Sequence, residues 1–297
     1  MQTRSNVTPP CLPRAISTGP SWKSPEDAKS LQDNDHKEDN VILPPQLKAS
    51  VWSEAQAADY PVRSVTYLQN RRKQAREESV LTLWAVDLVQ TDAPFSMCAH
   101  PTKRLQQSLL RGQSTSSSSS RIPAFLFAVN ICLPAPRGPL VRGSFYQFVA
   151  YFGTDDRARL FDDQTPVGRL AQAFCHGASD AYRDQTFKLI PKIAKGGIFV
   201  FRQVVGSKPV LLGQKVSQRY FRTKDYCEVL VDIASDPIAK RIVRMALGLA
   251  SHLTVDLSFC LEGKTEGTLP EQLLGGFRVQ GLNFATDGQR FVPSVVP

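Results

Sequence analysis

Three long apolar runs, rich in aromatic and β-branched residues, are the feature that most restricts how this chain can fold. They occupy residues 81–88, 124–133 and 144–152. Runs of this length and composition predict β-strands. The second and third runs are separated by a stretch with three prolines and one glycine between residues 134 and 139. Because this composition is typical of a turn, we expect the two runs to pair as antiparallel neighbours.

More strands than helices follow in the C-terminal half. Helices are expected at 166–174, capped by Thr165, at 237–250, opened by Ser235-Asp236-Pro237, and at 269–274. Strands are expected at 198–205, 210–220, 226–233, 254–261 and 277–284. Strands that follow strands, with helices inserted late, predict an α+β fold. We expect a mainly antiparallel, curved sheet, on which the amphipathic helix of the C-terminal half and the short helices pack.

Two segments lack the hydrophobic period of a folded element. Residues 1–48 are rich in Pro, Ser, Asp and Asn, and they predict a disordered tail. A Ser-rich loop insertion at about 102–121 is expected to be exposed. Within it, Ser114, which follows Arg111 in an Arg-x-x-Ser pattern, and Ser116 are candidate phosphorylation sites. Residues 49–293 are expected to form a single domain.

The net charge of +9 is concentrated in one segment. Residues 183–224 hold ten Lys and Arg side chains against one acid, Asp184. Average protein surfaces mix both signs, so this segment predicts a surface that binds an anionic partner. With Arg63 from the N-terminal part, the candidate contacts are Lys188, Lys192, Lys195, Arg202, Lys208, Lys215 and Arg219.

The neighbours of these cations set two structural expectations. The three lysines between 188 and 195 surround Pro191 and precede Gly196, so irregular chain is expected there. The cations of the strands that follow, Arg202, Lys215 and Arg219, alternate with apolar residues and are expected to face outward.

The helix expected at 237–250 can be interpreted in two ways. Its apolar stripe consists of Ile238, Ile242, Met245 and Leu249, and cations lie beside it. This profile is also that of a helix on a membrane surface. Because strands flank the helix on both sides, the sequence favours a stripe that packs on the sheet.

Patterns for catalysis and metal binding are missing from the sequence. It has no GxSxG, HExxH or phosphate-loop motif, and its four histidines share no metal-like spacing with acids or cysteines. The six cysteines form no CxxC and, without a secretory signal, are expected to be reduced, mostly buried thiols. We therefore expect a protein without catalytic activity, cofactor or bound metal.

Several short motifs occur together in an order that resembles a known family. They include 187–191, 206–209, 228–233 and 269–275. In this combination they resemble the C-terminal domain of the plant enhanced disease resistance two proteins, over about residues 49–285. The motif residues are Phe187, Lys188, Leu189, Ile190, Pro191, Gly206, Lys208, Pro209, Gly213, Asp232, Pro270 and Gly275.

The resemblance implies a membrane-associated, lipid-linked role with no known catalysis. In the plant proteins the domain follows a lipid-binding START domain and a pleckstrin-homology domain. A chain of 297 residues has no room for them, so a stand-alone domain is expected. The family's acidic cluster is missing around Phe174-Cys-His-Gly177.

Charge and resemblance together predict a regulatory, lipid-associated domain. We expect it to bind an anionic membrane surface peripherally from the cytoplasm, or to hold a lipid; no apolar run reaches the ~18 residues of a membrane span. The alternative is an adaptor that binds acidic protein segments or RNA through the same basic face. A lipid pocket would require an empty apolar interior under the 237–250 helix, whereas an adaptor would have a filled core. The first 25 residues lack acids, which leaves organelle targeting as an alternative location.

Overall fold

The computed structural model describes residues 47–99, 123–135, 144–177, 179–196 and 208–290. The expected tail up to residue 46, the Ser-rich insertion with Ser114 and Ser116, and the expected strand at 198–205 lie outside the described residues. Leu47, at the start of the described chain, already packs into the main hydrophobic core and accepts a hydrogen bond from the Trp52 indole (3.0 Å).

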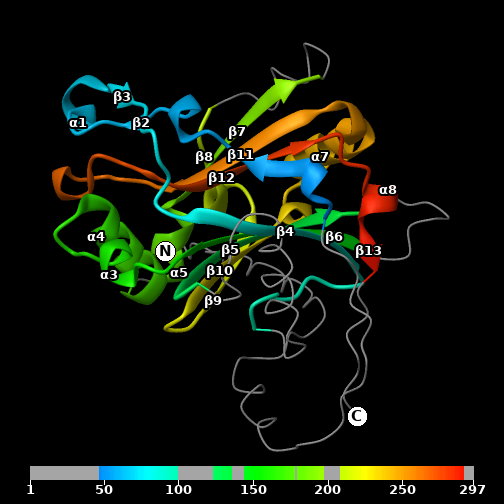
Figure 1. The fold of residues 1–297 in the computed structure, drawn as a ribbon, viewed down its shortest axis with the longest axis horizontal. Helices are drawn as coiled ribbons and strands as arrows, with labels where there is room; N and C mark the ends of the chain where they lie inside the picture. The colour runs from blue at the N-terminus through cyan, green and yellow to red at the C-terminus, as the bar shows by residue number, and fades with distance from the viewer. Residues whose placement is uncertain (1–46, 100–122, 136–143, 178, 197–207, 291–297) are drawn as a thin grey trace, which may run out of the picture. The chain divides into compact units, whose positions relative to one another are not determined.

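The three apolar runs form the centre of a six-stranded sheet (Figure 1). They correspond to β4 (Thr82–Thr91), β5 (Phe125–Pro134) and β6 (Phe145–Thr154). β6 pairs antiparallel with both β4 and β5, and its pairing with β5 is the one the sequence predicts. The sheet is completed by β9 (Ser217–Arg222), β10 (Tyr226–Asp232) and β13 (Gln289–Arg290), in the order β13-β4-β6-β5-β10-β9. β10 is parallel to β5, and β13 is parallel to β4.

A five-stranded sheet holds most of the remaining strands. Its order is β1 (Trp52–Glu54), β12 (Leu273–Gln280), β11 (Thr254–Leu261), β7 (Phe187–Lys195) and β8 (Val210–Leu211), all antiparallel. A small ribbon of β2 (Val62–Arg63) and β3 (Lys73–Gln74) stands apart from it. The α+β class with mainly antiparallel pairing is confirmed, and the strands divide between two main sheets.

Aromatic rings fill the space between the two main sheets. Phe152 of β6 packs on Phe259 of β11 with ring centroids 6.1 Å apart, and Phe148 of β6 packs on Phe277 of β12 at 5.3 Å. Phe187 of β7 stacks on Phe259 at 5.5 Å. All these rings are buried, so the main core consists of interdigitating phenylalanines from both sheets.

The longest helix of the described residues is α7 (Pro237–Leu249). The others are α1 (Tyr67–Asn70), α3 (Arg157–Leu160), α4 (Pro166–Gln172), which continues as a π-helical turn (Ala173–Gly177), α5 (Asp180–Asp184) and α8 (Phe284–Asp287). Short 3₁₀ turns occupy Ala49–Val51, Ala57–Asp59, Leu212–Gln214, Ile233–Ser235, Ala250–His252 and Glu266–Thr268. None of the helices in this part of the chain is long and apolar enough to cross a membrane.

Two of the three predicted helix starts are correct. The Thr165 hydroxyl accepts from the amide of Gly168 (3.0 Å), and the Asp236 carboxylate accepts from the amide of Ala239 (2.7 Å).

The helix expected at 269–274 is wrong, because β12 begins at Leu273. Leu274 points into the main core and Leu273 into a second buried cluster on the other face of the sheet. An extended chain buries both leucines, whereas one helix face would bury them together. The strand expected at 277–284 accordingly corresponds to β12, which ends at Gln280.

Candidate functional site

The lysines at 188, 192 and 195 lie on a regular strand, β7, where the sequence led us to expect irregular chain. Proline is tolerated there because β7 bonds through its other residues to β11 and β8. Lys188, Ile190 and Lys192 share one face of this strand. Arg202 lies outside the described residues.

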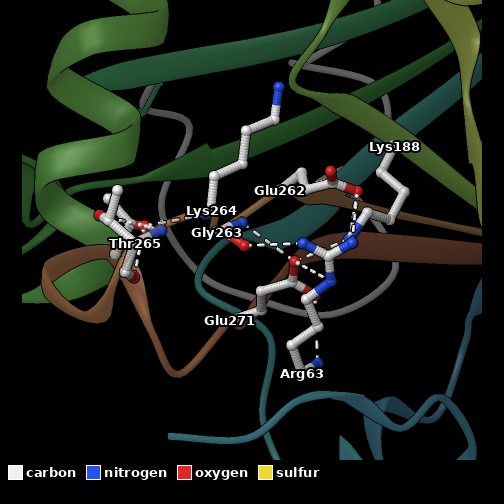
Figure 2. A network of polar contacts seen from close by, with 8 residues as sticks. Arg63, Lys188, Glu262, Gly263, Lys264, Thr265 and Glu271 are labelled. Carbon is white, nitrogen blue, oxygen red and sulfur yellow. Dashed lines mark hydrogen bonds and ion pairs between the residues drawn. The ribbon is translucent and has the colours of Figure 1, made fainter. Parts of the chain in front are cut away.

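Lys188 is buried in an ion network with two glutamates and Arg63 (Figure 2). Its ammonium lies 2.7 Å from Oε1 of Glu271 and 3.2 Å from Oε2 of Glu262. The Arg63 guanidinium contacts Glu262 (3.1 Å) and Glu271 (3.6 Å) and donates to the carbonyl of Gly263 (2.8 Å). Two cations and two carboxylates therefore neutralise each other, and Lys188 does not face solvent as a surface contact would require.

This network forms one wall of a cavity of about 170 Å³. The cavity is also lined by Pro61, Tyr67, Lys73 and Pro209. Burial on its own would lower the pKa of Lys188, but the pKa is raised because the Cys260 thiol and the carboxylates of Glu271 and Glu262 surround the ammonium. Since these charges are already paired, the geometry favours a structural role: it ties the 61–63 segment to the five-stranded sheet.

Lys192 also has a partner. Its ammonium lies 3.1 Å from the Asp59 carboxylate and 5.3 Å from the centre of the Tyr60 ring. The Tyr60 hydroxyl in turn donates to Asp256, which forms two hydrogen bonds with Arg278 (2.7 and 2.8 Å). Lys192 is therefore half-exposed and partly neutralised.

Lys195, Lys208 and Lys215 are exposed and make no ion pair with any part of the chain that the structure describes. Arg219 is exposed on the edge strand β9. Lys195 and Lys215 lie at opposite ends of α7. Lys195 pairs with Thr254, just after the 250–252 turn that follows α7, and the Ser217 amide donates to the Ser235 hydroxyl just before α7 (2.8 Å).

The apolar stripe expected on α7 is only partly covered: Ile242 and Leu249 are half-buried, whereas Ile238 and Met245 are exposed. Ile238 is 71% exposed and Met245 is 43% exposed, and none of the α7 side chains is fully buried. Ala239 and Val243 pack against the main core instead. Because these smaller side chains face the sheet, Ile238 and Met245 are turned toward solvent.

Three cations of α7 complete the basic surroundings of these apolar side chains. Arg241 and Arg244 are exposed and Lys240 is half-exposed, and none makes an ion pair with a described residue. With Lys195 and Lys215 they form what we call the α7 surface: Ile238 and Met245 among Lys195, Lys215, Lys240, Arg241 and Arg244. The sequence placed only two of these seven residues among its candidates.

A second exposed apolar spot was also missed. Val65, just before α1, is 63% exposed, and Leu68, within α1, is 39% exposed. The run Arg71-Arg72-Lys73 follows directly and is exposed. The run of three cations was the available signal, but it lies outside the most basic segment of the chain.

One further buried carboxylate has a structural explanation. Glu228 of β10 accepts hydrogen bonds from the Ser96 hydroxyl (2.6 Å), the amides of Cys98 (2.8 Å) and Met97 (3.0 Å), and the Asn130 amide group (2.8 Å). This carboxylate closes the 96–98 segment over the outer face of the six-stranded sheet.

Several family-motif residues hold the fold together. A Cβ on Gly213 would lie 2.3 Å from the Cα of Asp184, and one on Gly275 would lie 2.4 Å from the ring of Phe152, so both positions require glycine. Asp232 accepts from the amide of Ala234 (2.9 Å). Gly206 is outside the described residues; the others are Phe187, Leu189, Ile190 and Pro191 on β7, Lys208 and Pro209 before β8, and Pro270 before β12.

The interior beneath α7 is filled by the side chains of the main core, including Val243 and the phenylalanines. A second cavity, of about 340 Å³, lies beside α3 and α4 and has a mixed polar lining that includes Glu78, Asp156 and Arg159. By the criterion set from the sequence, the filled core argues against an enclosed lipid and agrees with what the adaptor alternative predicts.

The sequence matches the family described as "Protein ENHANCED DISEASE RESISTANCE 2, C-terminal" over residues 52–283. It is also 28% identical, over 235 residues, to "Protein ENHANCED DISEASE RESISTANCE 2-like" of Arabidopsis thaliana. That alignment covers 79% of this chain and 29% of the relative, so the chain spans less than a third of the relative's length. No solved structure matches the chain.

Proposed function

This chain belongs to the family of the C-terminal domain of Protein ENHANCED DISEASE RESISTANCE 2, and we propose that it is a non-enzymatic module that binds an anionic membrane surface peripherally. The observation that carries the proposal is the α7 surface. Three of its cations lie on α7 and two lie near its ends, and none of the five forms an ion pair with a described residue. Cations that are exposed and unpaired remain available for phosphate groups of lipids.

The expected strength follows from the number of cations. Each Lys or Arg close to an anionic membrane contributes about 1 kcal/mol. Five would give an upper limit of about 5 kcal/mol, which salt reduces over a Debye length of about 10 Å at 0.1 M. Lys188, Arg63 and Lys192 are left out of this sum because carboxylates already pair with them.

The test is sedimentation with phosphatidylcholine vesicles that contain or lack phosphatidylserine. The parent should bind only the anionic vesicles, and added salt should weaken the binding. The variant K195E/K215E reverses two cations of the α7 surface and should bind much more weakly.

The matched control is R222E/K224E. It makes the same charge change in the same basic segment, but at the other end of β9, about 17 Å from Ser217 at ~3.4 Å per residue. This variant should bind nearly as well as the parent. If both variants lose binding equally, the effect is one of net charge, and the α7 surface is not the site.

The second candidate function is an adaptor for acidic protein segments or RNA. The filled core is the observation that keeps it. An adaptor would use the same cations as a membrane-binding module, so only the ligand distinguishes the two functions. For an adaptor, an acidic peptide or RNA should bind with high affinity in the absence of lipid and should compete with anionic vesicles.

A further inference from the structure

α7 is fixed to the domain in one orientation. Asp236 caps its first turn, and the preceding 233–235 turn contacts β5 and connects directly to β10. Ala239 and Val243 pack against the main core. The helix therefore cannot rotate to bury its larger apolar residues without losing its cap and these contacts.

Ile238, Arg241 and Met245 form a row on the side of α7 turned away from the core. Their spacing of three and four residues places them one above the other at 100° per residue. Arg241 thus lies between the two exposed apolar side chains, and Arg244 lies one turn after Arg241. Within Pro237–Leu249 the remaining residues are apolar apart from Lys240, and the helix contains no acid.

Exposed large apolar side chains are few in the part of the chain that the structure describes. Among the described residues they are Val65, Leu68, Ile238 and Met245. Two of the four fall in one row of a single helix. Such a concentration marks an interaction surface rather than a random position on the outside.

We infer that α7 lies parallel to the membrane and inserts Ile238 and Met245 into the acyl region, while Arg241 and Arg244 remain at the phosphate level. This inference rests on the proposed function and adds to it an apolar part of the binding that salt does not screen. Arg and Lys side chains can hold their apolar stems in the interface and their charges in water. At 13 residues, or about 20 Å, the helix is long enough to lie in the interface and too short to span.

Charge selects a lipid surface as the occupant. A protein groove for an amphipathic helix contacts mainly its apolar face. On α7 the exposed row alternates apolar and cationic residues, and two more cations, Lys195 and Lys215, border its ends. A surface that offers acyl chains beneath a plane of phosphates matches both features at once.

The experiment compares I238S/M245S with the parent on anionic vesicles at low and at high salt. Both side chains are exposed, so the variant should keep the melting temperature of the parent. We expect binding weaker on the order of tenfold at low salt, and almost none at high salt, where the parent keeps a residual fraction. V65S/L68S, which removes the other two exposed apolar side chains, is the matched control and should keep the residual fraction.

A second measurement reports insertion itself. In M245W, acyl chains with bromine atoms should quench the new tryptophan beyond the quenching of the parent protein. In L68W they should not.

The results separate this inference from the proposed function. If the parent fails to bind anionic vesicles at low salt, both fail. If K195E/K215E loses binding but I238S/M245S binds like the parent at both salt concentrations, insertion fails and the charged surface stands. An equal loss in V65S/L68S, or equal quenching in L68W, would overturn the assignment to α7.

Discussion

Replacing Lys188 by methionine tests whether the buried ion network stabilises the fold. Lys188 is 4% exposed, and its ammonium pairs with the carboxylate of Glu271, a residue that is 1% exposed. In K188M the Glu271 carboxylate keeps two hydrogen-bond donors, the amides of Gly263 (3.0 Å) and Arg63 (3.1 Å), and the ion-pair contact with the Arg63 guanidinium at 3.6 Å. It loses its shortest contact with a cation, at 2.7 Å.

The size of the effect follows from this partial compensation. Removing one partner of a buried ion pair costs about 3–5 kcal/mol, and the remaining contacts of Glu271 place K188M at the lower end, about 3 kcal/mol. For a domain of this size the melting temperature should fall by about 6–12 °C. Urea unfolding followed by tryptophan fluorescence measures the free energy directly.

Two variants make the interpretation firm. K195M removes an exposed lysine at the other end of the same strand and should change the free energy of unfolding by less than about 0.5 kcal/mol. K188M/E271Q removes both charges but keeps an amide oxygen that can accept from the Gly263 amide. It should be more stable than K188M, because no buried carboxylate is left without its partner. If K188M unfolds at the same urea concentration as the parent, or if the double variant is the less stable one, the reasoning is refuted.

The pH dependence of this contribution has a definite sign. The folded pKa of Lys188 is raised. Its stabilisation is therefore fully present below the pKa of an unfolded lysine, about 10.4, and is lost as the pH rises through the folded pKa. The difference in the free energy of unfolding between the parent and K188M should stay constant through neutral pH and decrease only in strong alkali.

Three further predictions concern other parts of the chain. Although burial would raise the pKa of Asp256, its hydrogen bonds with Arg278 outweigh burial and hold the pKa below the usual value; the stability advantage of the parent over D256N should therefore be present above about pH 4 and shrink below it, as acid unfolding curves would show. Burial raises the pKa of Cys260 to about 12, so iodoacetamide at pH 8 should modify this thiol in urea but not in the native protein, which mass spectrometry of its peptide would reveal; native modification would contradict the burial. Replacing Ser114 and Ser116 by Asp adds negative charge to the Ser-rich insertion and should weaken binding to anionic vesicles at low salt, whereas equal binding would exclude a phosphorylation switch there.

The sequence predicted the strands better than the faces they present. The runs at 81–88, 124–133 and 144–152 became β4, β5 and β6 because aromatic and β-branched residues are buried on both faces of a central sheet. The antiparallel pairing of β5 with β6 followed from the short connection between them. Which strands share a sheet did not follow, because β10 joins β5 in parallel across about 90 residues of intervening chain.

Lys188 shows why the candidate site was only partly predictable. Because side chains alternate along a strand, the sequence indicates that Lys188, Ile190 and Lys192 share a face of β7. It does not indicate whether another segment covers that face. The cover comes from residues 55–63, more than 120 positions away, which bury Ile190 in a second hydrophobic cluster and bring Arg63 to the network. A lysine under such a cover must find carboxylates, and Glu262 and Glu271 supply them. The sequence around Lys188 does not indicate that a distant segment covers it.

α7 presents the same problem in reverse. The helix has apolar residues on two sides. One side has the larger side chains of Ile238 and Met245, and the other has the smaller side chains of Ala239 and Val243. Burial of area alone would select the larger face. The Asp236 cap and the connection to β10 set the rotation of the helix, however, and the smaller face allows it to approach the sheet. Leaving Ile238 and Met245 in water has a free-energy cost that covering them would remove. The membrane surface proposed above would cover both side chains with acyl groups and would place anionic phosphates opposite the cations beside them.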